Sequence, residues 1–185
     1  AKPDAGFMDA FSEMNLSVTL IDDNNIRTTN FSNYDLIFIG KDKIVNSKYL
    51  PINNSNTVIA NGFYGKLFGL SDKNILPKVI SNFPLDVIKN NEEIQVYTKS
   101  TFIMKGISIP YYYIPSEDKN ENMQTVAKVY FSHGDKDGDV ISYSSNGANK
   151  CFFGITQTKY WTNEAKSLFK DCVGFVLEGN QEPSP

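Results

Sequence analysis

The spacing of apolar positions predicts that the first half of the chain alternates helices with strands. Phe7, Met8, Phe11 and Met14 recur at helical intervals behind Asp4, whose side chain can cap a helix. Short apolar runs then predict three strands, over residues 16–21, 34–40 and 57–60, and a further helix from about residue 64. Because strand, crossover and strand repeat in this order, the pattern indicates an α/β fold built on a parallel sheet.

The second half of the chain has a different pattern, which predicts antiparallel strands followed by one helix. Extended segments are expected over residues 93–97 and 101–109, and antiparallel strands over 126–132, 140–145 and 150–155. The Asn146-Gly147 pair favours a tight hairpin turn between the last two strands. A final helix should begin after Thr162 and end at Gly179. Its buried face is expected to hold the apolar positions Ala165, Leu168, Phe169, Cys172, Val173 and Val176.

Composition sets the broad class. The chain has 185 residues, of which 41% are hydrophobic and 13% aromatic, enough for one folded domain and too apolar for a disordered chain. We expect a single domain over residues 1–179 and a linker-like tail over 180–185. The net charge of -3 argues against a nucleic-acid partner, and no apolar stretch is long enough for membrane insertion.

Three segments together resemble the class I glutamine-amidotransferase-like superfamily, especially its ThuA-like branch. They are the Asn33-Tyr34-Asp35 start of an apolar strand ending at Gly40, the segment 101–107 with Lys105-Gly106-Ile107, and Phe153-Gly154-Ile155 followed by Trp161-Thr162-Asn163-Glu164. The resemblance implies a flavodoxin-like three-layer sandwich, in which a mainly parallel sheet with a late antiparallel hairpin carries helices on both faces. It also implies a ligand cleft at the carboxyl ends of the parallel strands, which here would be lined by Asp22, Asp23, Lys41, Asn61 and Phe63.

The catalytic residues of that superfamily are missing from the matching positions. Its catalytic members hold a cysteine on the turn after the third strand, where this chain has Asn61-Gly62, and a histidine after the last strand, where it has residues 157–160 without histidine. We therefore expect no amidotransferase activity. The family also starts with an interior strand, whereas this chain starts with a helix, so a strand donated by a neighbouring copy could fill the place.

A short acidic run offers a weak calcium site. Asp135, Asp137 and Asp139 alternate as in the opening of a calcium loop, but Val140 and Asn146 stand where such a loop needs glycine and glutamate. A hairpin turn with solvated aspartates is the preferred reading, and no cofactor is expected beyond weak calcium binding. The single histidine, His133, lies beside this run and is more readily structural than catalytic.

Cys151 and Cys172 leave two alternatives open. They are either two buried thiols or, if the last helix packs on the strand that contains Cys151, a disulfide, which would argue for an oxidising compartment. The chain also contains sequons for N-glycosylation at Asn15, Asn30 and Asn53. An aromatic set is either a binding surface or core: Phe63, Tyr64, Tyr111, Tyr112, Tyr113 and Trp161.

These features favour a non-catalytic structural or binding module of a surface or secreted protein, multidomain or self-assembling. Its partners would be neighbouring domains or copies of the same protein, and its location extracellular or at the cell surface. The alternative is an intracellular, cytoplasmic ThuA-like small-molecule-binding protein or hydrolase that uses the cleft. In that case Asp23, Asn61 and His133 should converge.

Overall fold

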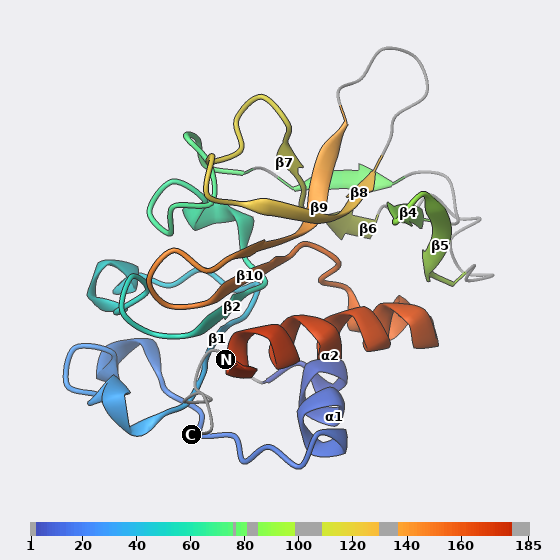
Figure 1. Cartoon of the computed structure of the whole chain (residues 1–185). Helices are drawn as coiled ribbons and strands as arrows, with labels where there is room; N and C mark the ends of the chain where they lie inside the picture. Colours follow the sequence, from blue (N-terminus) through green and yellow to red (C-terminus); the bar gives the residue numbers. More distant parts are fainter. Residues whose placement is uncertain (1–2, 76, 81–84, 99–108, 130–136, 179–185) are drawn as a thin grey trace, which may run out of the picture.

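The computed structural model describes residues 3–75, 77–80, 85–98, 109–129 and 137–178, which form a mixed α/β fold (Figure 1). The strands are β1 (Ile37–Ile39), β2 (Thr57–Ile59), β3 (Lys78–Ile80), β4 (Leu85–Lys89), β5 (Glu92–Tyr97), β6 (Ile109–Tyr111), β7 (Ile114–Pro115), β8 (Gln124–Val129), β9 (Gly138–Ser144) and β10 (Lys150–Phe153). The α-helices of this part are α1 (Ala5–Glu13) and α2 (Asn163–Glu178). Short 3₁₀ helices are η1 (Asp23–Asn25), η2 (Phe31–Asn33), η3 (Ser47–Tyr49), η4 (Gly62–Tyr64) and η6 (Thr158–Tyr160).

The main sheet has eight strands in the order β1-β2-β10-β9-β8-β4-β5, with β7 paired to β9, and β3 pairs with β6 in a separate ribbon. Only the pairs β1–β2 and β2–β10 are parallel in this sheet as described. The expected late hairpin is confirmed, because β9 and β10 are antiparallel on either side of the Asn146-Gly147 turn. The expectation of a mainly parallel sheet is wrong, since the other described pairs of this sheet are antiparallel, among them the hairpins β4–β5 and β9–β10.

Both α-helices pack on one face of the sheet (Figure 1). Phe7 and Phe11 of α1 meet Phe169 of α2 with ring centroids 4.9 and 5.5 Å apart, and Phe153 of β10 lies 5.2 Å from Phe169. As expected, the Asp4 carboxylate accepts from the Gly6 amide at the start of α1. The buried side chains of α2 are those that the helical spacing predicts: Ala165, Leu168, Phe169, Cys172, Val173 and Val176.

The opposite face carries no α-helix among the described residues. Its core joins Ile37, Ile39, Ile59 and Phe152 of the sheet to apolar side chains from loops and 3₁₀ helices. These loop and 3₁₀ side chains are Ile26, Phe31, Ile52, Phe68, Leu70 and Ile75. A sandwich with helices on both faces is therefore not what this part of the chain forms.

Two expected elements are absent. Residues 16–21 form no strand and leave Val18 and Leu20 exposed at 40% and 63%, because no strand of the sheet is in place to pair with them. The helix expected from residue 64 is replaced by η4 and turns. Gly69 has a φ of +69°, and the amides of Leu70 and Ser71 turn back to the Gly65 carbonyl, so the chain reverses where a helix would continue.

The ion pairs of Glu13 join α1 to α2, and they allow a prediction of how the stability of the protein changes at acid pH. Its carboxylate pairs with the ammonium groups of Lys166 and Lys170, and these hydrogen bonds lower its pKa from 4.5 to about 2. Because the pKa of Glu13 is lower in the folded protein than in the unfolded chain, its ionised carboxylate stabilises the fold. This stabilisation is complete above about pH 4.5 and is lost as the pH falls toward 2. Glu13→Gln should therefore narrow the stability difference between pH 5 and pH 2, measured as urea midpoints. At 1 M NaCl the two proteins should respond alike, and an unchanged acid response of the variant at low salt would contradict the assignment.

Candidate functional site

The carboxyl ends of β1, β2 and β10 meet at one edge of the sheet, the place where α/β proteins commonly bind ligands. Asn61 follows β2 there and is fully buried. Its Nδ2 donates to the carbonyls of Gly40 (3.1 Å) and Asp42 (2.8 Å), and its Oδ1 accepts from the Phe63 amide (3.0 Å). The side chain thus uses both ends to join the loop after β1 to the start of η4.

Tyr112 covers the same edge. Its amide donates to the Gly154 carbonyl (2.9 Å), just beyond β10, and its ring lies against Gly62 so closely that a Cβ there would collide with it. Only 6% of Tyr112 is exposed, and burial raises its pKa. Phe63, 44% exposed, packs edge-on against Tyr112 at 6.2 Å. The space beside the carboxyl ends of β2 and β10 is therefore filled by an aromatic ring of the chain itself.

Lys41, after β1, pairs with Asp4 at the start of α1. Lys41 Nζ lies 2.9 Å from Asp4 Oδ2, while the Thr158 hydroxyl and the Gly6 amide donate to Asp4 Oδ1. Burial alone would raise the pKa of Asp4, but these hydrogen bonds and the Lys41 charge hold that pKa below its ordinary value. The arrangement ties α1 to β1 and to η6.

Asp23 has a comparable internal role. Its carboxylate accepts from the amides of Val45 (3.2 Å) and Asn46 (2.9 Å), and Asn46 Nδ2 donates back to the Asp23 carbonyl (3.0 Å). Asp22 precedes η1, is exposed and makes no capping bond with its side chain. In the described residues, no hydrogen bond or ion pair joins the side chains of Asp22, Asp23, Lys41, Asn61 and Phe63 to one another. His133, the third member of the expected constellation, lies outside the described residues.

The acidic run is not a turn at Asp139. This residue is in β9, fully buried, and its carboxylate pairs with Lys119 Nζ at 3.0 Å. The hydroxyls of Thr125 and Ser142 donate to it at 2.9 and 3.2 Å. Asp137 lies 3.5 Å from Lys128 Nζ, and Asp135 is outside the described residues. The expectation of solvated aspartates is thus wrong for Asp139, because strand pairing carries the residue inward.

These two aspartates provide a matched pair of substitutions. Asp139→Asn should lower the free energy of unfolding by about 2 kcal/mol, because it removes the buried negative charge that pairs with Lys119. The loss is no larger because the Lys119 ammonium can still reach water. Asp137→Asn should cost less than about 1 kcal/mol, because its pair with Lys128 is longer and only half-buried, so water still screens it. Urea unfolding of both variants checks the prediction. Equal losses would contradict the buried network around Asp139.

The cysteine alternatives are distinguished in the structure. Cys151 of β10 and Cys172 of α2 form a disulfide with their Cα atoms 5.8 Å apart, within the usual range. The three sequon asparagines all lie at exposed positions. Asn30 Oδ1 accepts from the Ser32 amide (3.3 Å), and Asn53 Oδ1 from Lys150 Nζ (3.2 Å), so two of them also hold local structure.

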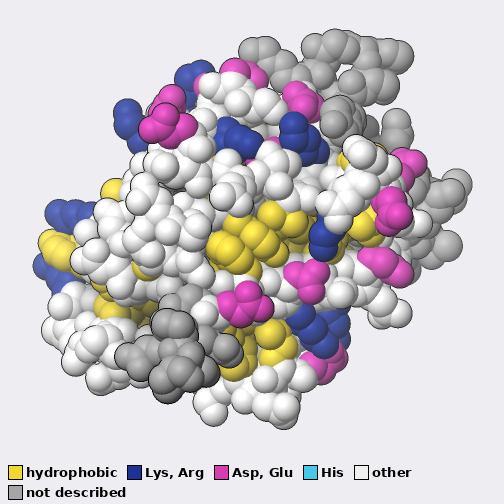
Figure 2. Space-filling model, in the orientation of Figure 1, with side chains coloured by type: hydrophobic (Ala, Val, Ile, Leu, Met, Phe, Trp, Pro, Cys, Tyr) yellow, Lys and Arg dark blue, Asp and Glu magenta, His cyan; other side chains and the backbone are white. Residues whose placement is uncertain are grey.

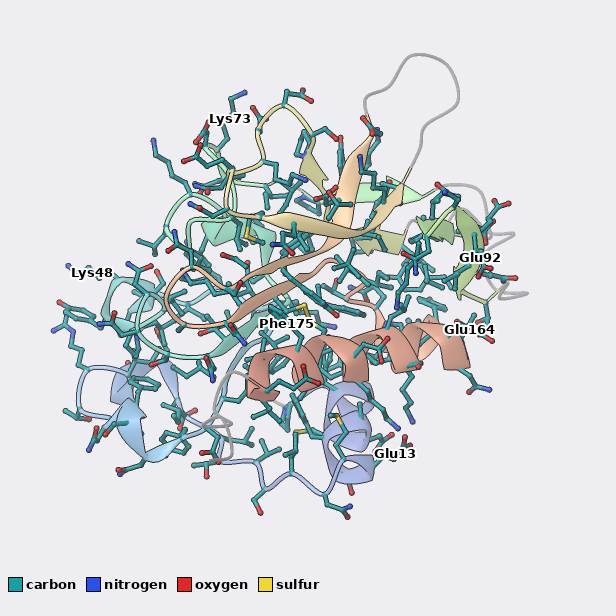
Figure 3. The ribbon with its side chains drawn as sticks, viewed as in Figure 1. Glu13, Lys48, Lys73, Glu92, Glu164 and Phe175 are labelled. Carbon is teal, nitrogen blue, oxygen red and sulfur yellow. A yellow bond between two sulfur atoms is a disulfide. The ribbon has the colours of Figure 1, made fainter. Side chains whose placement is uncertain are left out.

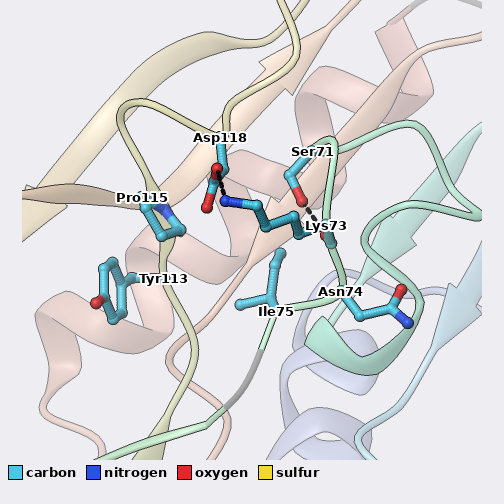
Figure 4. Close-up of a pocket in the computed structure, with 7 residues that line it drawn as sticks. All are labelled: Ser71, Lys73, Asn74, Ile75, Tyr113, Pro115 and Asp118. Atoms are coloured by element: carbon cyan, nitrogen blue, oxygen red, sulfur yellow. Dashed lines mark hydrogen bonds and ion pairs between the residues drawn. The ribbon is translucent and has the colours of Figure 1, made fainter.

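Most of the expected aromatic set belongs to the core. Tyr111 and Tyr112 are buried, and Trp161 donates to the Ile155 carbonyl (2.8 Å) while its ring packs on Phe169. Tyr113 instead lines a hollow of about 200 Å³ that the sequence reasoning did not identify (Figure 4). Its lining residues are Ser71, Lys73, Asn74, Ile75, Tyr113, Pro115 and Asp118. Lys73 spans this hollow to reach Asp118 at 2.7 Å, and the Ser71 hydroxyl donates to the Lys73 carbonyl.

Comparisons with known proteins support the fold class and identify no family. No family model matches the chain, and no curated protein matches it. The chain is similar in structure to the cytoplasmic protein STM1381 from Salmonella typhimurium LT2, with a TM-score of 0.55 and 12% sequence identity over 96% of this chain and 86% of the other. This likeness supports the α/β fold. The expected extracellular or cell-surface location is contradicted by this neighbour, which is described as cytoplasmic, and that expectation is withdrawn.

The described part of the chain contains no helix that is long and apolar enough to cross a membrane.

Proposed function

We propose that the chain is a non-catalytic amidotransferase-like domain that acts as a structural or binding module. It would work through contacts with neighbouring domains or with copies of itself rather than by turning over a substrate. The parallel strands β1, β2 and β10 with α1 and α2 are the part of the fold that supports the flavodoxin-like comparison. The proposal takes no cofactor.

The observation that carries the proposal is the position of Asn61. The resemblance puts this residue on the turn where catalytic members of the superfamily hold their nucleophile. Here its amide joins the Gly40 and Asp42 carbonyls to the Phe63 amide and is buried. Tyr112 then covers the adjoining strand end. A residue so engaged supports loop structure, and a nucleophile would need to be free and exposed.

Ligand mapping on the ¹⁵N-labelled chain tests this proposal. Thermal shift against a library of small acids, sugars and nucleotides selects compounds, and amide spectra then locate each one. We expect no stabilising compound to shift the amides of Asn61 and Phe63 in a saturable manner. A saturable shift of both, lost in Asn61→Ala but kept in an exposed control such as Asn54→Ala, would overturn the proposal in favour of a small-molecule-binding protein or hydrolase.

A further inference from the structure

Arg27, Lys48 and Tyr49 form a small surface that we call the basic patch. The Arg27 guanidinium lies over the Tyr49 ring at 4.5 Å from its centroid, and Lys48 Nζ lies at 5.1 Å. All three residues are exposed, Tyr49 to 40%. Stacking on an aromatic ring fixes a guanidinium while leaving its in-plane N–H donors available. The patch therefore presents positive charge in a defined orientation.

The loops that carry the basic patch are fastened to each other. Asp23 binds the amides of Val45 and Asn46, just before η3, and so joins the loop of Arg27 to the loop of Tyr49. The amides and hydroxyls of Thr28 and Thr29 all donate to the Asn25 carbonyl, which fixes the turn around Arg27. A prearranged surface loses little conformational entropy when a partner binds.

No carboxylate of the described residues pairs with Arg27 or Lys48. Arg27 is also the single arginine among the 18 basic residues of the chain. Arginine differs from lysine in its fork of donors, which matches a carboxylate with two parallel hydrogen bonds. Arginine and tyrosine are also enriched among the residues that contribute most to protein interfaces.

The opposite end of the molecule presents the complementary charge. Glu92 and Glu93 begin β5, the outermost strand on that side, and both are exposed. Neither has a cationic partner within the part of the chain that the structure describes. Figure 3 shows Lys48 and Glu92 at opposite ends, and Figure 2 shows basic side chains around an apolar one at the left edge and acidic ones at the right.

We propose that the basic patch of one copy binds the Glu92–Glu93 end of a second copy. This inference rests on the proposed function and names the surfaces through which copies would meet. The contact joins two different surfaces at opposite ends, so it does not close on itself, and each bound copy leaves a free end for the next. Short linear oligomers that shorten as salt rises are the expected product.

Charge reversal and mixing test the inference. Sedimentation velocity of the full chain over a concentration series, at low and high salt, first measures whether copies associate. Arg27→Glu with Lys48→Glu, and separately Glu92→Lys with Glu93→Lys, should each raise the dissociation constant at least about tenfold, because like charges then face each other. Mixing the two double variants should restore association into alternating linear oligomers, because each surface of one variant then meets a surface of opposite charge on the other.

Lys66→Glu with Lys159→Glu is the matched control, because both lysines are exposed and lie outside the basic patch. It should leave association near the wild-type value, and thermal unfolding of every variant checks that it is folded. A monomeric wild type at all concentrations overturns this inference but leaves contacts with neighbouring domains, and so the proposed function, standing. Association that resists both charge reversals also overturns it. Failure of the proposed function itself would appear in the ligand mapping at Asn61 instead.

Discussion

Replacing Cys151 and Cys172 together by alanine is expected to lower the free energy of unfolding by about 3 kcal/mol. The bridge closes a loop between positions 21 residues apart, and closing such a loop removes conformations from the unfolded chain. It also joins two fully buried positions, β10 at the centre of the sheet and α2 on its face, so small cavities add to the loss.

Guanidinium unfolding of the oxidised wild type, the reduced wild type and the double variant measures this effect. Both the reduced wild type and the variant should be less stable than the oxidised protein, and the variant should be the less stable of the two because of its cavities. Intact mass before and after alkylation shows which form is present. A native protein with two free thiols, or an oxidised protein no more stable than the variant, would contradict the prediction.

Asn61→Ala is expected to cost about 3 kcal/mol, because it removes three hydrogen bonds, each contributing about 1 kcal/mol, from a buried position. The Gly40 and Asp42 carbonyls and the Phe63 amide would lose their partner at once. Asn54→Ala is the matched control, since Asn54 is exposed on the loop before β2 and its replacement should change stability by less than about 0.5 kcal/mol. Urea unfolding of the two variants measures the difference, and similar stabilities would contradict the assigned role.

Local signals predict α1 and α2 well, although the helix expected from residue 64 does not form. Asp4 and Thr162 cap α1 and α2 by accepting hydrogen bonds from amides two and three residues ahead. The residues that determine where each helix begins are therefore neighbours in the sequence. The buried face of α2 follows from the 3.6-residue period for the same reason. The strands β1, β2, β9 and β10 were recognised because each is a short run of apolar or β-branched residues.

Pairing between distant segments was not predictable in the same way. Residues 16–21 have the composition of a strand but find no partner, whereas β4 was not anticipated and becomes a strand between β5 and β8. The sequence around Asp139 is typical of a turn, but the pairing of β9 with β8 places this residue in the interior beside Lys119. In each case the deciding contact comes from a segment far along the chain, which periodicity does not report.

The site shows the same division. The topology of parallel strands placed Asn61 correctly at their carboxyl edge, since that edge follows from strand direction. Tyr112 covers this edge because it packs closely against Gly62 and Gly154. The local sequence pattern does not predict this packing. Likewise, the roles of Asp23 and Lys41 depend on partners elsewhere in the chain, the loop at Val45 and the start of α1.

We propose that the polar residues near this edge hold loops together rather than bind a ligand. The most direct measurement is the free energy of unfolding of Asp23→Ala and Asn61→Ala beside wild type in urea. Residues kept for ligand binding commonly leave stability unchanged or raise it when they are replaced. Our account predicts that both variants are clearly less stable than wild type, with the larger loss for Asn61→Ala. Equal or greater stability of either variant would contradict it.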